Sequence, residues 1–157
     1  RETADEIRFY IEENCWSPEK ASYTMHAGGD DLDCGVLLAA RTGYCDSDDA
    51  RLAATVDAIR RELSAGGPLL YRYSGVQGDE GAFVACSFWL VEALAHLGRL
   101  DEARAVMDEM VALANDVCLY SEQIDPRSLE FLGNIPQALS HLALIGAATS
   151  IANAEQR

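Results

Sequence analysis

The sequence predicts an all-α fold built from two concentric layers of helices. Six stretches have apolar residues at helical spacing, and clusters of Gly, Pro, Asp and Ser separate them. No run of alternating apolar and polar residues is long enough for a sheet. The stretches also alternate between an amphipathic kind and a kind that is apolar nearly all round. This pattern predicts that outer and inner helices alternate along the chain.

The amphipathic stretches are expected to form the outer layer. They cover residues 4–13, 49–64 and 101–114. In the second, Leu52, Val56 and Ile59 share one helix face, which leaves the opposite face for solvent.

The apolar stretches are expected to form the inner layer. They cover residues 32–40, 81–97 and 135–152. In "EGAFVACSFWLVEALAHLG", large apolar side chains such as Phe83, Trp89 and Leu94 point in every direction around the helix. A helix of this kind must be surrounded by protein.

Two architectures fit an alternation of outer and inner helices: an α/α toroid and a solenoid of stacked helical hairpins. The segment "GRLDEARAVMDEMVALA" suits a tetratricopeptide-like hairpin, which would make the chain a non-catalytic module that binds a protein partner. Self-similarity at a period of about 34 residues is missing, however. The toroid is therefore preferred, and the hairpin module is kept as the alternative.

Composition limits the class of protein. The 157 residues suffice for a single domain, expected to span residues 1–157, and 49% of them are apolar, enough to bury a core. The net charge of −14 would repel nucleic acid and anionic membranes. No apolar run is long enough to cross a membrane, and the first dozen residues are too charged for a signal peptide. We expect a soluble chain that binds neither nucleic acid nor membranes.

Cysteine and histidine usage indicates a reducing, cytoplasmic setting and no metal site. The chain has five cysteines, an odd number without CxxC spacing, and most of them sit in apolar stretches as buried thiols do. His26, His96 and His141 lack the paired spacing of metal ligands. Cys86 and Cys118 have no basic neighbour in sequence that would lower a thiol pKa, so we expect both to be buried thiols and not nucleophiles.

The loops that enter the three inner helices are acidic. They read "AGGDDLD", "VQGDEG" and "YSEQIDP". If the inner helices run parallel, as strict alternation requires, these loops gather at one end of the molecule. Helix capping explains such acids without any function, and it is the preferred interpretation for Asp33 and Asp79.

Glu122 differs because it lies well ahead of the last inner helix, in an irregular segment of roughly 15 residues. It is either a solvated loop residue or an acid placed for chemistry. Inverting glycoside hydrolysis needs a carboxylate that activates water, facing a carboxylic acid. Tyr71, Arg72 and Tyr73 could stack on a sugar and bind its hydroxyl groups, although a surface ion pair beside two half-buried tyrosines is the preferred interpretation of this stretch alone.

Three segments resemble the C-terminal half of the catalytic domain of glycoside hydrolase family 15, the glucoamylase and trehalase-like enzymes. The motifs are "EGAF-x-x-CSFWLV", "SEQ-x-D" and "GN-x-PQA-x-SH", in order and at the family's spacing, and the resemblance covers about residues 4–152. It implies half of an (α/α)6 toroid, about six of twelve helices. It further implies exo-acting, inverting hydrolysis of an α-linked glucoside or oligosaccharide, without metal or organic cofactor.

The resemblance also implies roles for individual residues. Glu122 falls where the family keeps its catalytic base, and Arg72 falls where an arginine holds substrate hydroxyl groups. Glu80 falls at the rim of the active site, and Tyr73 belongs to the same substrate-binding group.

The sequence departs from the family at the general acid. That acid belongs to a W-E-x-R-like segment, whereas here Trp16 and Trp89 are followed by Ser17 and Leu90. We therefore expect an incomplete active site with weak or no activity alone. A half toroid also leaves inner helices without neighbours, so we expect a homo-oligomer or a complementing chain to cover that flank.

Overall fold

A computed structural model describes residues 2–156. Arg1 and Arg157, which belong to the predicted 1–157 domain, lie outside the described residues. The described chain contains these elements in order: α1 Glu2–Asn14, β1 Trp16–Ser17, β2 Ser22–Tyr23, the 3-10 helix η1 Cys34–Leu38, α2 Ala39–Thr42, α3 Ala50–Glu62, β3 Ser64–Gly66, β4 Leu69–Leu70, β5 Ala82–Phe83, α4 Val84–His96, α5 Leu100–Ala112, β6 Gln123–Ile124, β7 Phe131–Leu132 and α6 Ala138–Ala154.

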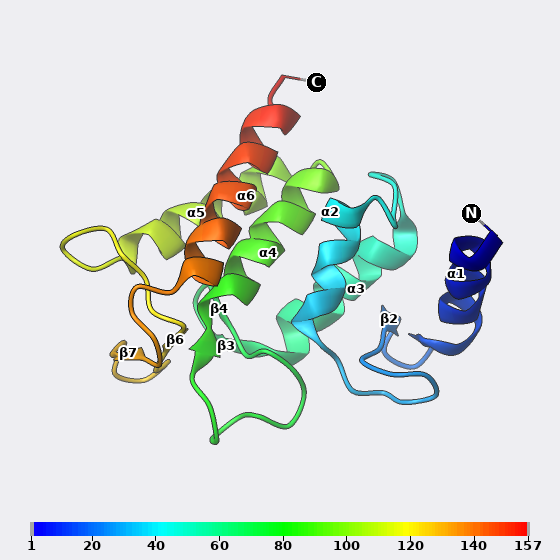
Figure 1. Ribbon diagram of the computed structural model, residues 1–157, viewed down its shortest axis with the longest axis horizontal. Coiled ribbons are helices and arrows are strands. Elements are labelled where there is room, and N and C mark those ends of the chain that lie inside the picture. Colours follow the sequence, from blue (N-terminus) through cyan, green and yellow to red (C-terminus); the bar gives the residue numbers. More distant parts are fainter. Residues whose placement is uncertain (1, 157) are drawn as a thin grey trace.

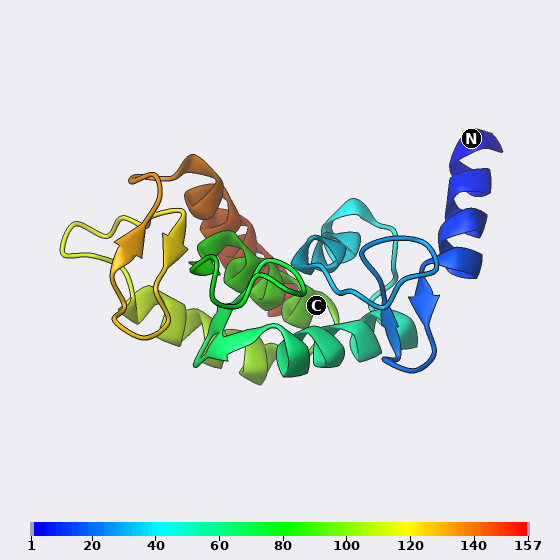
Figure 2. The ribbon, with the colours of Figure 1, turned by 90° about the horizontal axis from the view of Figure 1, so that it is seen from below.

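The helices form the two layers that the sequence predicts. Figure 2 shows α3 and α5 in one row, with α2, α4 and α6 in a second row beside it, while α1 stands at one end. In Figure 1 the inner helices α2, α4 and α6 run side by side in the same direction. The predicted all-α architecture with alternating outer and inner helices is confirmed.

Helix α4 lies at the centre of the inner layer. All of its residues are buried except Trp89 and His96. Phe88 packs edge-on against Tyr120, with ring centroids 5.4 Å apart. A fully buried side chain of this size contributes roughly 1.5–3 kcal/mol relative to an exposed one. The predicted inner character of residues 81–97 is therefore confirmed.

Local side chains set where the neighbouring helices begin. Asp49 caps α3, because its carboxylate accepts a hydrogen bond of 2.9 Å from the Leu52 N–H. Asp33 caps η1 in the same way, accepting a 2.6 Å bond from the Gly35 N–H, as predicted. The stretch 32–40 thus begins as a 3-10 helix and continues as the single turn of α2, instead of forming one longer helix.

An ion pair joins the inner helices α2 and α4, and α6 packs against it. Arg41 of α2 donates from Nε to both carboxylate oxygens of Glu92 in α4, at 2.9 and 3.1 Å. Gly146 of α6 lies against this pair, since a Cβ atom there would be 2.6 Å from the Arg41 guanidinium. Gly146 therefore lets α6 approach α2 and α4 closely.

Seven short strands were not predicted. They form the hairpins β1–β2 and β3–β4 and the three-stranded antiparallel sheet β5–β6–β7. Each strand has two or three residues. A strand this short spans at most one alternation of side chains, so it leaves no period in the sequence.

Helix α6 differs from its prediction as a fully surrounded helix. Its buried residues are Ser140, Ala143 and Ala147, all small. Leu139, Leu142 and Ile145 are 41%, 61% and 61% exposed. The side that faces α4 is covered, and the opposite side has no neighbour within residues 2–156.

Helix α1 is also largely uncovered. None of its described residues is buried, and Ile7, Phe9 and Tyr10 are exposed. It contacts the rest of the fold through the partly buried Ile11, which packs against the core, and through Glu12, which accepts hydrogen bonds from Tyr23 and Tyr44 at 2.9 and 2.7 Å. Within residues 2–156 no helix is both long enough and apolar enough to cross a membrane.

The outer helices α3 and α5 are joined by an ion-pair network around Glu102. Arg99 donates to both of its carboxylate oxygens, at 2.7 and 2.9 Å, and Arg60 donates to one of them. These hydrogen bonds, led by those from Arg99, lower the pKa of Glu102 from 4.5 to about 2. The charged form is thus favoured in the folded state.

We predict that Glu102→Gln lowers the free energy of unfolding near neutral pH by ~0.5–1 kcal/mol, a modest amount because the pair is partly solvated. Because the folded pKa is depressed, this contribution is present above pH 4.5 and is lost as pH falls towards 2. Urea unfolding across this range measures it. Glu109→Gln on the same helix is the control. A wild-type advantage that stays constant down to pH 2 contradicts the assignment.

Candidate active site

The acidic loops gather at one end of the molecule, here called the acidic end. In Figure 1 the inner helices all begin at the lower edge, where the loops before η1, α4 and α6 also lie. Backbone contacts join these loops directly. The Cys34 N–H donates to the Arg72 carbonyl at 2.9 Å, and Asp33 forms a β-bridge with Tyr73. Loops far apart in sequence thus share one site region.

The sheet β5–β6–β7 connects Glu122 to the start of α4. Its register pairs Phe83 with Gln123, and Gln123 with Leu132. Beside this ladder, the Val84 N–H at the first turn of α4 donates to the Glu122 carbonyl at 3.1 Å. The backbone of Glu122 is therefore fixed to the most buried helix of the protein.

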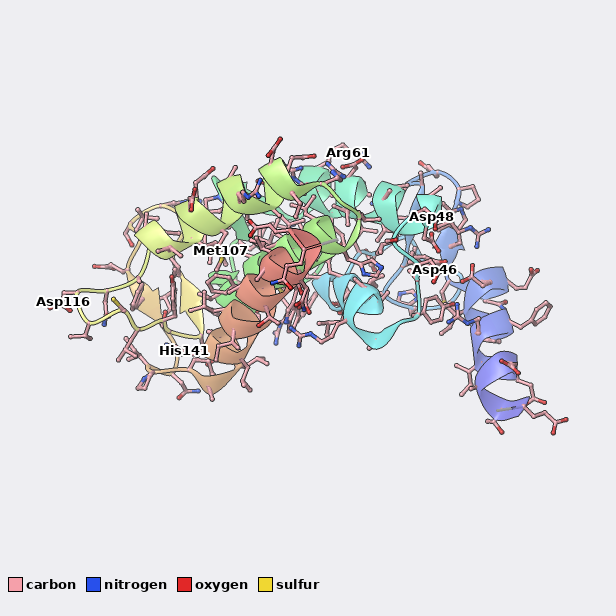
Figure 3. All side chains as sticks on the ribbon, turned by 90° about the horizontal axis from the view of Figure 1, so that it is seen from above. Asp46, Asp48, Arg61, Met107, Asp116 and His141 are labelled. Atoms are coloured by element: carbon pink, nitrogen blue, oxygen red, sulfur yellow. The ribbon has the colours of Figure 1, made fainter. Side chains whose placement is uncertain are left out.

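Tyr120 and Ser121, the two residues that precede Glu122, attach its segment to α6. The buried Ser140 hydroxyl donates to the Ser121 carbonyl at 2.8 Å, and the Tyr120 N–H donates to His141 Nε2 at 3.3 Å. The other ring nitrogen of His141 lies 2.7 Å from the Gln137 carbonyl. His141 thus has hydrogen-bond partners at both ring nitrogens, and Figure 3 shows it at the start of α6 beside the segment that carries the strands.

The Glu122 side chain is half-buried and held at one oxygen. Its Oε2 accepts hydrogen bonds from the Asn134 side-chain amide at 3.1 Å and from the Asn134 backbone N–H at 3.3 Å. Its own backbone N–H donates to the Asn134 carbonyl at 2.9 Å. Glu122 is therefore an oriented carboxylate, which the sequence alone left undecided.

Arg72 lies between two aromatic rings and one carboxylate. Its guanidinium carbon is 4.9 Å from the Tyr73 ring centroid and 5.5 Å from the Phe83 ring centroid. One terminal nitrogen donates to both carboxylate oxygens of Glu80, at 2.8 and 3.1 Å. The Nε atom is buried and has no hydrogen-bond partner among residues 2–156. An orphaned buried donor of this kind is costly.

The other loop acids have different surroundings. A cavity of about 260 Å³ lies beside the sheet, and Tyr71, Asp79, Glu80, Asp125 and Arg127 are among the residues that line it. Asp125 accepts hydrogen bonds from the backbone N–H groups of Arg127 and then Ser128, and these lower its pKa.

The predicted cap Asp79 does not cap α4, whose N-cap residue is Phe83 without a side-chain hydrogen bond. Asp79 is exposed and lines the cavity instead. The short strand β5 leads the chain directly into α4, so the acidic loop ends before the first helical turn.

Sequence reasoning missed Asn134 as a neighbour of Glu122. The two residues are separated by the whole β6–β7 hairpin, and neither lies in a periodic element. The only available signal was the "GN" of the third motif. Local patterns do not report which loop residues meet across a hairpin.

The described residues show how the possible metal ligands and the thiols are placed. Among residues 2–156, no three His, Cys, Asp or Glu side chains converge to hold a metal ion. Cys86 is buried at the start of α4, and burial raises its pKa well above the ordinary value. The expectation of buried thiols holds for Cys34, Cys45 and Cys86 but is wrong for Cys118, which is exposed in the loop after α5.

Solved structures of other proteins share this arrangement of helices. A wild-type glycosidase superposes with a TM-score of 0.84 at 19% sequence identity, covering 96% of this chain and 43% of that one. A variant of a glycosidase in complex with glucose matches equally well, with a TM-score of 0.84 at 18% identity. The described helices thus form part of an (α/α)6 toroid of the glycosidase type.

The chain belongs to glycosyl hydrolases family 15, whose family model matches residues 1–149. It is 42% identical to the trehalase of Mycolicibacterium smegmatis over 139 residues, which cover 85% of this chain and 21% of that enzyme. It is 40% identical to the trehalase of Mycobacterium tuberculosis over 162 residues, covering 99% of this chain and 24% of that enzyme. The chain therefore spans about a quarter of the length of these relatives.

We predict that Ser140→Ala loosens the Glu122 segment. The change leaves the buried Ser121 carbonyl without its partner and should lower the free energy of unfolding by ~1–3 kcal/mol. Hydrogen exchange at the Glu122 amide should also accelerate. Thr149→Ala is the control, because that hydroxyl is exposed and bonds only within α6. Equal effects of the two changes on stability and exchange would contradict this anchor.

Proposed function

We propose that this chain supplies the general-base side of the active site of an inverting α-glucoside hydrolase, with trehalose as the substrate. The observation that carries the proposal is the oriented Glu122 carboxylate at the acidic end, in a chain of a glycosidase family. The choice of trehalose is supported by the relatives, which are trehalases at up to 42% identity.

In the proposed reaction, Glu122 takes a proton from water while the water oxygen attacks the anomeric carbon. The bond between that carbon and the glycosidic oxygen breaks, and a carboxylic acid on the opposite side protonates the leaving oxygen. The products are two sugars, one of them with inverted configuration. In this scheme Glu122 ends protonated and the acid ends as a carboxylate, so that protons balance.

We assign substrate binding to Arg72, Tyr73 and Glu80. The terminal nitrogens of the partly exposed Arg72 guanidinium are suited to a sugar hydroxyl, and the Tyr73 ring offers a flat apolar surface for a sugar face. Glu80 fixes the guanidinium through its paired hydrogen bonds and can accept from hydroxyl groups at the rim. The sequence suggested Arg72 and Glu80 separately. Because the two side chains are hydrogen-bonded, we propose that they bind the substrate together.

The general acid is proposed to come from outside these 157 residues. The printed sequence contains no W-E-x-R-like segment, and the curated relatives are about four times as long as the part matched here. Proton donation to a leaving group is typically worth ~10²–10⁴ in rate. The 157 residues alone should therefore hydrolyse glucosides weakly or not at all.

We propose that the exposed side of α6 is the surface that packs against the rest of the toroid. Leu139, Leu142 and Ile145 lie on this side, and Ile135 is exposed just before the helix. An apolar patch of this kind marks an interface. In the absence of a complementing chain, the same surface should pair two copies of this one.

We also propose a cytoplasmic location. The support is the cysteine usage, since all five thiols are free and three of them are buried. The net charge of −14 further supports a sugar, rather than a nucleic acid or an anionic membrane, as the ligand.

We predict that Glu122→Gln nearly abolishes hydrolysis without weakening substrate binding. The test enzyme is the trehalase of Mycolicibacterium smegmatis in which this chain replaces the matching segment. Because an amide cannot take the proton from water, kcat on trehalose should fall by ~10²–10⁴ while KM changes little.

The control is Glu130→Gln, an exposed glutamate in the same segment, which should keep kcat. Unfolding curves for both variants should match the parent. A Glu122→Gln enzyme that turns over trehalose at the parent rate would remove Glu122 from the chemistry.

For the α6 surface, we predict that the 157-residue chain self-associates at micromolar concentration in sedimentation. The double change Leu142→Glu and Ile145→Glu places charges on the exposed side, so it should yield monomers with an unchanged circular dichroism spectrum. Asp108→Lys on the exposed side of α5 is the control and should leave association intact. A strictly monomeric parent chain would contradict the proposal.

A further inference from the structure

Asn134 makes more hydrogen bonds to Glu122 than any other described residue. Two donors, its side-chain amide and its backbone N–H, converge on the same carboxylate oxygen, Oε2. Its carbonyl accepts from the Glu122 N–H. Among residues 2–156, no donor reaches the other oxygen, Oε1. The two carboxylate oxygens therefore differ in their surroundings.

The residue before Asn134 completes this arrangement. Gly133 has a positive φ of 72°, and a Cβ atom at this position would lie 2.8 Å from Glu122 Oε2 and 3.0 Å from Glu122 Cβ. A side chain here would be strained and would also displace the carboxylate. The backbone of Gly133 thus forms a wall against which the Glu122 side chain rests.

We propose that Asn134 is a positioning residue for the general base: it holds Oε2, so that Oε1 is the atom that accepts the proton from water. This inference rests on the proposed role of Glu122. A carboxylate with both donors on one oxygen keeps its lone pairs free on the other and cannot rotate without breaking two hydrogen bonds. Water activation depends on such orientation, because a misplacement of about 1 Å can cost ~10²-fold in rate.

The side-chain amide can be tested separately from the backbone pairing. The bond from the Glu122 N–H to the Asn134 carbonyl involves no side chain of Asn134 and survives any substitution that keeps the loop conformation. The strands β6 and β7 also stay paired. A change at Asn134 should therefore alter the carboxylate more than the loop.

The experiment uses the same trehalase in which this chain replaces the matching segment. Asn134→Ala should lower kcat on trehalose by ~10–10²-fold with KM changed by less than about threefold, since orientation of the base matters in the transition state and not in binding. Asn134→Asp keeps the shape but removes the side-chain donors and adds a like charge beside Oε2, so it should lower kcat at least as much near neutral pH. A residue that serves packing alone would tolerate this isosteric change.

The matched control is Asn115→Ala. Asn115 also bonds loop backbone, accepting from Val117 and Leu119 N–H groups, but it does not touch Glu122. It should keep kcat even if it lowers stability. Gly133→Ala is a second variant, expected to lower kcat because its Cβ atom would displace the carboxylate.

The outcomes separate this inference from the proposed function. If Glu122→Gln abolishes turnover while Asn134→Ala and Asn134→Asp keep kcat, the positioning role is overturned and the base remains. If the Glu122→Gln enzyme keeps the parent turnover, both the proposed role of Glu122 and the positioning role of Asn134 are contradicted. A loss of kcat that follows loss of stability equally in the Asn115 and Asn134 variants also overturns the positioning role.

Discussion

The arrangement of the acidic end depends on the backbone pairing of β5 with β6. Through this pairing, and through the Val84 N–H that donates to the Glu122 carbonyl, an irregular segment of the surface is attached to the first turn of the most buried helix. Hydrogen bonds in a half-buried sheet are costly to break because the groups they satisfy cannot easily find water. The position of Glu122 is therefore set by its hydrogen bonds to the core and not by the loop alone.

The packing of α4 explains why a few hydrogen bonds are enough to hold the loops of the acidic end in place. Its apolar surface is covered by η1, α5 and α6, so its first turn is fixed relative to all of them. Ser140 of α6 reaches the Ser121 carbonyl, and Cys34 of η1 reaches the Arg72 carbonyl. The three inner helices therefore carry the site between them, as expected for a toroid whose loops meet at one end.

The sequence predicts the helices well because apolar periodicity reports burial directly, as Leu52, Val56 and Ile59 illustrate. Through the family resemblance it also singles out Arg72 and Glu122, whose roles are proposals. It cannot predict the two-residue strands or the contact between Asn134 and Glu122, because these arise from the meeting of distant segments. The pattern of α6 predicts a surrounded helix, yet one side of it has no neighbour within residues 2–156, so Leu142 and Ile145 are exposed.

The most direct measurement of the central claim is native-state hydrogen exchange at the amides of Val84 and Glu122. If the sheet makes the Glu122 segment part of the core, both amides should open with the same free energy as the central amides of α4, such as that of Leu94. Exchange of the Glu122 amide as fast as that of Asp116, at the tip of the loop after α5 in Figure 3, would contradict the account, because the carboxylate would then be carried by a freely opening loop.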